Sequence, residues 1–113
     1  MHELSLTEKI LRLVLTEAET HRAKRVTKIK IVIGELSGIL ESCVEFYFQL
    51  IAKDTPAQGA KLEFTRAEAR LYCIHCAKEF KKQPRDFLCP ECGSLGRLTA
   101  SGQECTVESI EVE

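Results

Sequence analysis

The chain has 113 residues, of which 44% are hydrophobic and 29% are charged, and its net charge is −1. This length allows one compact domain or one domain with a small satellite, and the balanced charge gives no reason to expect a nucleic-acid partner. No apolar run approaches the roughly 18–20 residues that span a bilayer, and the first residues lack the basic and apolar regions of a signal peptide. We therefore expect a cytoplasmic protein without a membrane partner.

The first half of the chain predicts two helices separated by a strand. Residues 5–8 have the form of a capping box, and apolar residues then recur at helical spacing as far as about His21. These apolar residues are Leu6, Ile10, Leu11, Val14, Leu15 and Ala18. Alternation at 26–33 predicts a strand. A second capping box at 42–45 predicts a helix that stops before Pro56, because proline disfavours helical geometry in the preceding residue.

The second half predicts two more strands. Around Leu62 and Phe64, apolar residues alternate with polar ones. Residues 104–112 alternate again, which places Glu108 and Ile110 on one face and Val107 on the other. Residues 101–113 also carry four acidic groups and no basic ones. Two helices and three strands predict an α+β fold in which the two helices cover a three-stranded sheet as a two-layer sandwich.

The segment between the last two strands contains two C-x-x-C pairs, formed by Cys73 and Cys76 and by Cys89 and Cys92. It has few large apolar side chains, so burial alone cannot offset the entropy lost on ordering it. Each pair can turn two thiolates toward one ion, and two pairs complete a tetrahedron, so the spacing predicts a structural zinc site. We expect a rubredoxin-like zinc ribbon at 71–100, inserted into an α/β domain formed by 1–70 plus 101–113.

Other uses of the paired cysteines are a redox dithiol and an iron–sulfur cluster. A thioredoxin-type site expects one pair that opens a helix after a strand, and neither pair has that setting. His75, inside the first pair, either faces outward or acts as a ligand or hydrogen-bond donor at the site. Pro90 and Gly93 suit a tight turn around the second pair. Cys43 and Cys105 stand alone and are explained as small buried apolar residues.

The N-terminus offers a second set of metal donors. The α-amine of Met1, the backbone amide of His2 and the His2 imidazole can chelate one ion through adjacent small rings, and Glu3 adds an amide and a carboxylate. Nitrogen and oxygen donors in a square-planar or tetragonal arrangement suit Ni(II) and Cu(II). A histidine at position 2 is usually incidental, so this chemistry alone does not assign a site. His21, near a helix C-terminus, is explained by favourable interaction with the helix dipole.

Four motifs in sequence order resemble one protein family. Met-His-Glu-Leu-Ser at 1–5, Gly-Glu-Leu-Ser-Gly at 34–38, the two cysteine pairs and Ser-Ile-Glu-Val at 109–112 resemble the HypA/HybF family of hydrogenase maturation nickel metallochaperones. The resemblance covers essentially the whole chain. It implies a nickel-binding α/β domain and a zinc-ribbon domain. It also implies nickel ligands at Met1, His2 and Glu3, and zinc ligands at Cys73, Cys76, Cys89 and Cys92.

The resemblance implies a function as well. Family members pass Ni(II) toward the large subunit of [NiFe] hydrogenase, working with the GTPase HypB, and in some organisms they serve urease, which adds urease accessory proteins as candidate partners. The chain is then a binding and delivery protein rather than an enzyme, with Zn(II) as structural cofactor and Ni(II) as transferred cargo. Some members use an aspartate after the Gly-Glu motif as a further nickel ligand, where this chain has Leu40 with Glu41 beside it. Glu35 either orients the nickel loop or caps a turn.

Two other function classes fit parts of the sequence. A zinc-ribbon adaptor that binds protein or nucleic acid would place Lys78, Lys81, Lys82 and Arg85 against phosphates, although the near-neutral charge and the lack of interleaved exposed aromatic residues oppose it. A thiol redox enzyme would cycle the four paired cysteines between dithiol and disulfide without metal. Metal content and thiol titration distinguish these classes from a metallochaperone.

Overall fold

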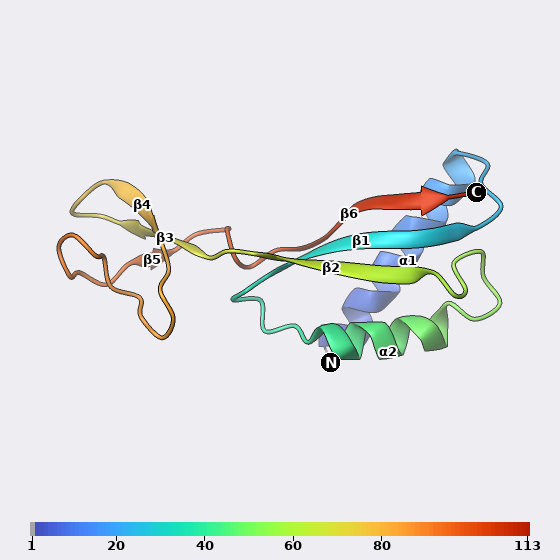
Figure 1. The fold of residues 1–113 in the computed structure, drawn as a ribbon, viewed down its shortest axis with the longest axis horizontal. Helices are drawn as coiled ribbons and strands as arrows, with labels where there is room; N and C mark the ends of the chain where they lie inside the picture. Colours follow the sequence, from blue (N-terminus) through green and yellow to red (C-terminus); the bar gives the residue numbers. More distant parts are fainter. Residues whose placement is uncertain (1) are drawn as a thin grey trace. The chain divides into compact units, whose positions relative to one another are not determined.

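The computed structural model describes residues 2–113, except for the side chain of His2, as two compact units. The first, here the α/β unit, comprises Met1–Val32, Ile39–Thr65 and Thr106–Glu113, and the second, here the cysteine unit, comprises Ile33–Gly38 and Arg66–Cys105. Figure 1 shows the helices and strands in chain order: α1 (His2–Thr20), β1 (Val26–Gly34), α2 (Glu41–Ile51), β2 (Lys61–Ala67), β3 (Arg70–Cys73), β4 (Lys78–Lys81), β5 (Arg97–Leu98) and β6 (Cys105–Val112). No helix in this part of the chain is long and apolar enough to cross a membrane.

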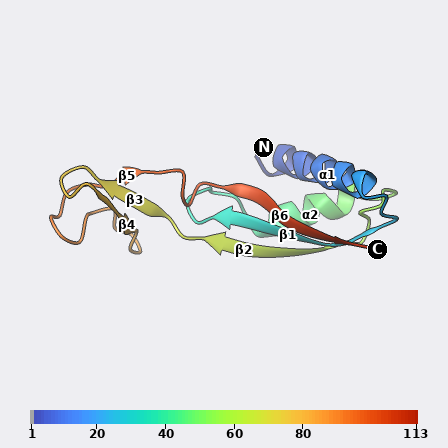
Figure 2. The same cartoon turned by 90° about the horizontal axis from the view of Figure 1, so that it is seen from above.

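The α/β unit is a two-layer sandwich. Its sheet has the strand order β2-β1-β6, and both helices lie on one side of that sheet (Figure 2). Alternate residues of the central strand, Ile29 and Ile31, are fully buried, as are Val14 of α1 and Val44 and Phe48 of α2. The strand period of two and the helix period of 3.6 therefore bring apolar faces together as their spacing predicts. The predicted α+β sandwich of two helices on a three-stranded sheet is confirmed.

The first helix begins earlier than the sequence pattern predicts. Because α1 starts at His2, Ser5 lies inside the helix and does not cap it. Thr7 is fully buried, and its hydroxyl donates to the carbonyl oxygen of Glu3 one turn earlier. Glu3 lies in the first turn, where a carboxylate interacts favourably with the positive end of the helix dipole. The helix ends at Thr20, close to the predicted end at His21.

The second predicted capping box is also wrong. The N-cap of α2 is Leu40, in extended conformation with φ −94° and ψ 120°, and no side chain caps the helix. Instead, the Leu40 N–H donates to the Glu3 carboxylate at 3.4 Å, so a contact between the two helices takes the place of a local cap. The sequence pattern identifies both helices and misplaces both starts, because capping motifs describe only local contacts.

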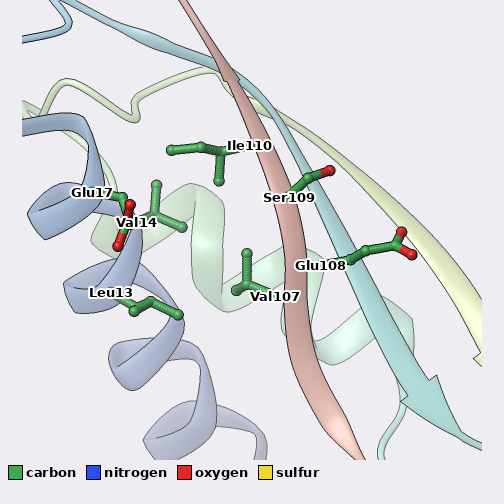
Figure 3. A pocket seen from close by; sticks show the side chains of 7 residues that line it. All are labelled: Leu13, Val14, Glu17, Val107, Glu108, Ser109 and Ile110. Atoms are coloured by element: carbon green, nitrogen blue, oxygen red, sulfur yellow. The ribbon is translucent and has the colours of Figure 1, made fainter. Parts of the chain in front are cut away.

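The predicted alternation along the last strand is interrupted in β6. Glu108 and Ser109 are both exposed, whereas Val107 and Ile110, three residues apart, are both half-buried. Figure 3 shows the side chains of Val107 and Ile110 on the side of α1, and that of Glu108 pointing away from it. Glu108 and Ile110 therefore do not share a face.

The cysteine unit contains a small sheet with the strand order β4-β3-β5. β3 pairs antiparallel with β4, with Leu71 opposite Phe80, and antiparallel with β5, with Leu71 opposite Leu98. The buried cluster of this unit consists of Leu71, Cys73, Phe80 and Cys89. Two of its four members are thus cysteines, so the core of this unit and the predicted metal site coincide.

Candidate metal centres

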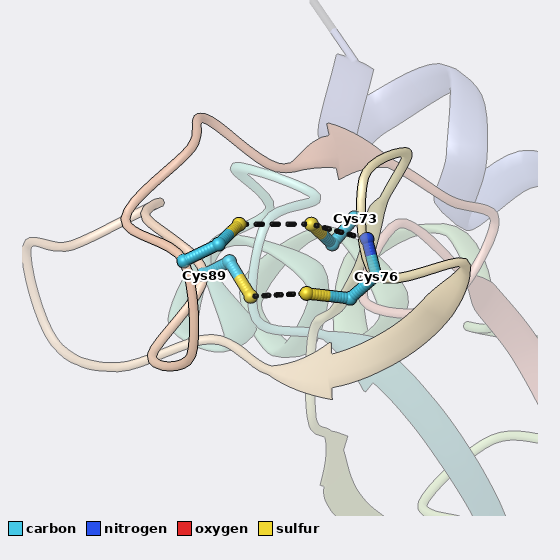
Figure 4. Close-up of side chains that lie close together, drawn as sticks. Cys73, Cys76 and Cys89 are labelled. Carbon is cyan, nitrogen blue, oxygen red and sulfur yellow. Dashed lines mark hydrogen bonds between the residues drawn. The ribbon is translucent and has the colours of Figure 1, made fainter.

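The structure brings the four paired cysteines together. Their sulfur atoms all lie within 4.8 Å of one another, and they form a group of side chains that could hold a metal ion (Figure 4). The Sγ atoms of Cys73 and Cys92 are 3.5 Å apart, and those of Cys76 and Cys89 are 3.9 Å apart. Cys73 and Cys89 are buried, whereas Cys92 is exposed.

The two turns that present the sulfur atoms follow from the local sequence. Cys73 ends β3, and the backbone N–H of Cys76 points back to the Cys73 sulfur at 3.4 Å. In the second turn, the Gly93 N–H donates to the Cys89 carbonyl oxygen at 2.8 Å. Gly93 has φ +76°, a conformation that costs glycine little because it has no Cβ. The expected turn around the second pair is therefore present, with glycine at the position that requires it.

The spacing of the sulfur atoms fits a tetrahedral zinc ion. A Zn–S bond of about 2.3 Å gives a tetrahedron whose sulfur atoms are about 3.8 Å apart. The two short sulfur pairs lie within a few tenths of an ångström of that edge. These short pairs join one C-x-x-C motif to the other, Cys73 to Cys92 and Cys76 to Cys89. Such an arrangement surrounds a single point, whereas a redox dithiol needs two sulfur atoms of one motif to pair.

The electrostatics of the four thiols show what a cation would change. Hydrogen bonds that the Cys76 thiol donates to the Cys73 and Cys92 sulfur atoms, together with desolvation, raise the pKa of Cys76 to about 12. Hydrogen bonds from the side chain and backbone of Ser94 lower the pKa of Cys92 to about 6. Four crowded thiols cannot all lose their protons while they repel one another, and a divalent cation among them removes that obstacle. The donor set therefore favours a soft divalent ion bound with release of protons.

The side chains around the cysteines do not extend the candidate ligand set. His75 is exposed, and within the described residues the group of candidate ligands holds the four cysteines alone. Lys78 forms an ion pair with Glu91, and Lys81 forms one with Glu68 at 2.9 Å. Lys82 lies 4.5 Å from the centre of the Phe87 ring. Three of the four cations that an adaptor would use on phosphates thus have intramolecular partners.

The N-terminal donors are only partly within the described structure. Met1 and the side chain of His2 lie outside the described residues. Of the predicted nickel ligands, Glu3 is placed: its residue is half-buried, and its carboxylate accepts the hydrogen bond from the Leu40 N–H. Glu41 follows as the first residue of α2. The first turn of α1, at Glu3, and the segment around Leu40 are therefore close together in the α/β unit.

Sequence reasoning left the role of Glu35 open, and the structure gives it a contact. Its carboxylate accepts a hydrogen bond from the Ala69 N–H at 2.6 Å, and its own N–H donates to the Ala67 carbonyl oxygen at 3.0 Å. Beside it, a Cβ on Gly34 would lie 2.2 Å from the backbone of Gly102. Glu35 therefore ties the Gly-Glu motif to the segment around Ala67 and Ala69, within the cysteine unit. No sequence signal marked Ala69 as the partner of Glu35, or Gly102 as the neighbour of Gly34.

The two remaining cysteines lie outside the cluster. Cys43 on α2 and Cys105 on β6 are half-buried free thiols. Desolvation raises the pKa of Cys105. Neither belongs to the group of candidate metal ligands found among residues 2–113.

Comparisons with known proteins agree across the whole chain. The family described as "Hydrogenase/urease nickel incorporation, metallochaperone, hypA" matches residues 1–112. The hydrogenase maturation factor HypA of Caldanaerobacter subterraneus subsp. tengcongensis is 43% identical and is aligned over 100% of both chains. A protein of the same name from Dehalococcoides mccartyi is 40% identical over 100% of this chain and 95% of its own length.

Two solved structures share the fold. A solution structure of a HypA protein is 25% identical with a TM-score of 0.77, covering 100% of this chain and 97% of its own. The solution structure of the nickel metallochaperone HypA from Helicobacter pylori is 24% identical with a TM-score of 0.74, covering 99% of this chain and 97% of its own. With the four cysteines positioned for zinc binding and the family model matching from residue 1 to residue 112, this chain belongs to the HypA family of hydrogenase maturation nickel metallochaperones.

Proposed function

We propose that this protein binds Ni(II) at Met1, His2 and Glu3 and delivers it, with a partner GTPase of the HypB type, to the large subunit of [NiFe] hydrogenase during maturation. The observation that carries the proposal is the match of the nickel-incorporation family over residues 1–112, which includes the Met-His-Glu start. The protein then acts by binding and releasing a metal ion and not by catalysing a reaction. Its partners are proteins, and urease accessory proteins are further candidates. We expect the protein to act in the cytoplasm.

The start of α1 supports the proposed nickel site. Because the helix begins at His2, the backbone N–H groups of His2 and Glu3 lie in its first turn, where no carbonyl oxygen of the same helix can accept from them. These amide nitrogens are therefore available to bind a metal ion, with release of their protons to water. Amide, amine and imidazole nitrogens form the tetragonal donor set that Ni(II) prefers. A site at a chain terminus also leaves coordination positions open to the recipient, as delivery requires.

We further propose that Cys73, Cys76, Cys89 and Cys92 hold Zn(II) as a resident structural ion. Four sulfur donors at tetrahedral spacing leave no position for a substrate, which separates this site from a catalytic one. When bound, the ion crosslinks the two C-x-x-C turns. In domain terms, the zinc ribbon is residues 71–100, and the nickel-binding domain is 1–70 plus 101–113.

Nickel titration of the zinc-loaded protein tests the proposed function. Wild type should bind one Ni(II) per chain, as followed by calorimetry, and His2→Ala should reduce the affinity at least tenfold while the zinc content stays the same. The matched control is His21→Ala, which removes an exposed histidine at the other end of α1 and should leave nickel binding unchanged. An extension that blocks the Met1 amine should act like His2→Ala. Nickel affinity that survives both changes would refute the site assignment.

A further inference from the structure

One edge of the α/β unit combines an open strand with an apolar groove. β6 forms an edge of the sheet, because the strand order is β2-β1-β6. An edge strand presents one row of backbone N–H and C=O groups that no neighbouring strand uses. Between β6 and α1 lies a cavity of about 210 Å³, which is lined by the polar residues Glu17, Glu108 and Ser109 and by four apolar residues, Leu13, Val14, Val107 and Ile110. Figure 3 shows these four side chains gathered between the helix and the strand.

The two faces of this edge differ in character. On the side of α1, Val107 and Ile110 point into the groove, and Leu13 is left 47% exposed above it (Figure 3). On the other side, the Glu108 carboxylate points away from α1, and within the described part of the chain it has no ion-pair partner. Its neighbour Glu111 already lies 3.9 Å from Lys28, so Glu108 is the unpaired anion at the middle of the strand.

The open edge of β6, the apolar side chains beside it and the unpaired Glu108 together indicate what kind of ligand fits this edge. A strand that pairs with β6 would present alternate side chains to the two faces, because successive residues of a strand point in opposite directions. Its α1-side residues would meet an apolar groove, and its other residues would meet Glu108. We propose that the outer edge of β6 and the groove beside α1 bind an extended segment of a partner protein, in which apolar residues alternate with lysine or arginine.

The charge of β6 argues against a second copy of this chain as the occupant. Residues 101–113 carry four acidic groups and no basic ones, so two β6 strands placed side by side would bring like charges together. Like charges directly opposite each other destabilise a strand pair, and opposite charges stabilise it. A basic extended segment would pair with the β6 backbone, place apolar side chains in the groove and place a positive charge beside Glu108. The inference concerns the α/β unit alone and does not depend on either metal site.

A model peptide tests the proposal. The probe is a fluorescently labelled peptide of eight residues, the length of β6, that alternates valine and lysine. We expect saturable binding by the full zinc-loaded chain, with the amide chemical-shift changes confined to β6 and the facing side of α1. A peptide that alternates valine and glutamate should not bind there. The valine–lysine peptide with alternate backbone amides methylated should lose binding, because it cannot complete the strand pairing.

Variants of the protein separate the two faces. Glu108→Lys should weaken binding of the valine–lysine peptide about fivefold or more, and it should allow the valine–glutamate peptide to bind. The matched control is Glu8→Lys, which changes an exposed glutamate of α1 that does not line the groove and should leave peptide binding unchanged. Ile110→Lys should block the groove. If Ile110→Lys does not fold, Glu108→Lys still decides the matter, because Glu108 is a surface residue.

Three results would overturn the proposal. The first is no binding of the valine–lysine peptide, or equal binding of the two peptides. The second is a set of chemical-shift changes elsewhere, such as on β2, the other edge of the sheet. The third is self-association of the chain through β6 that Ile110→Lys abolishes, since the edge would then be occupied by a second copy.

Discussion

The α/β unit and the cysteine unit bury their cores by different means. In the α/β unit, fully buried side chains such as Ile29, Ile31 and Phe48 come from a strand and a helix that follow each other in the sequence, β1 and α2. In the cysteine unit, half of the small buried cluster is cysteine, namely Cys73 and Cys89. Apolar burial can therefore stabilise the first unit, whereas we expect the second unit to need a metal ion that crosslinks its cysteines.

The same contrast separates the two metal sites. The sulfur atoms of the four cysteines lie within 4.8 Å of one another, and two of these cysteines belong to the buried cluster, so an ion held by them would be part of the fold. Of the proposed nickel donors, Glu3 lies in the first turn of α1 and is half-buried, outside the buried core of the α/β unit. Loss of the first ion should therefore unfold a unit, and loss of the second should leave the structure intact. A resident metal and a transferred metal require these opposite arrangements.

The largest effect should follow removal of one buried zinc ligand. Cys89→Ser should abolish zinc binding and unfold the cysteine unit, because a structural zinc site contributes about 10–16 kcal/mol to folding in zinc-finger peptides. Amide spectra should lose dispersion in Arg66–Cys105 and keep it in the α/β unit. The control is Cys105→Ser, a thiol outside the cluster, which should retain one zinc per chain. If both units unfold together in Cys89→Ser, the contrast between them is wrong.

A smaller loss of stability, with no loss of zinc, should follow the truncation of a core side chain in the α/β unit. Phe48→Ala should lower the free energy of unfolding by about 3–5 kcal/mol, because Phe48 is fully buried and its loss leaves a cavity. Zinc content, measured by elemental analysis, should not change. Phe46→Ala, on the same helix but 62% exposed in the wild type, should alter stability by less than about 0.5 kcal/mol. A loss of zinc in Phe48→Ala would show that the two units do not fold independently.

The smallest effect should come from Glu35. Glu35→Ala removes the acceptor of the Ala69 N–H and should cost about 1 kcal/mol of stability, whereas Glu35→Gln retains an oxygen acceptor and should cost less. Nickel affinity, measured by the same titration as for His2→Ala, should be equal in all three proteins. A nickel affinity that falls in Glu35→Ala at unchanged stability would mean that Glu35 orients the nickel loop, and the structural role assigned from its contacts would be wrong.

Sequence patterns predicted the features that depend on spacing. The alternation of Ile29 and Ile31 fixed the buried face of β1, and the C-x-x-C spacing brought four sulfur atoms within 4.8 Å. Both patterns reflect local backbone geometry, which a single sequence displays directly. The apolar stripe of α1 was likewise correct for Ile10, Val14 and Ala18, which are buried.

Features that depend on distant contacts were missed. At the start of α2 the Leu40 N–H donates to the Glu3 carboxylate, 37 residues away in the sequence, and a local capping box does not record such a contact. The contact between Glu35 and Ala69 spans 34 residues and left no trace in periodicity. The interruption of β6 at Glu108 and Ser109 moved Ile110 to the face of Val107. Tertiary structure decides such contacts, and a local pattern does not record them.

X-ray absorption at both metal edges, on protein loaded with one zinc and one nickel ion per chain, tests the account most directly. We predict four sulfur neighbours at zinc, supplied by Cys73, Cys76, Cys89 and Cys92, and only nitrogen and oxygen neighbours at nickel. His2→Ala should remove the nickel signal without changing the zinc spectrum. Sulfur in the nickel shell, or a zinc shell that changes when nickel binds, would contradict the separation of a resident site from a transfer site.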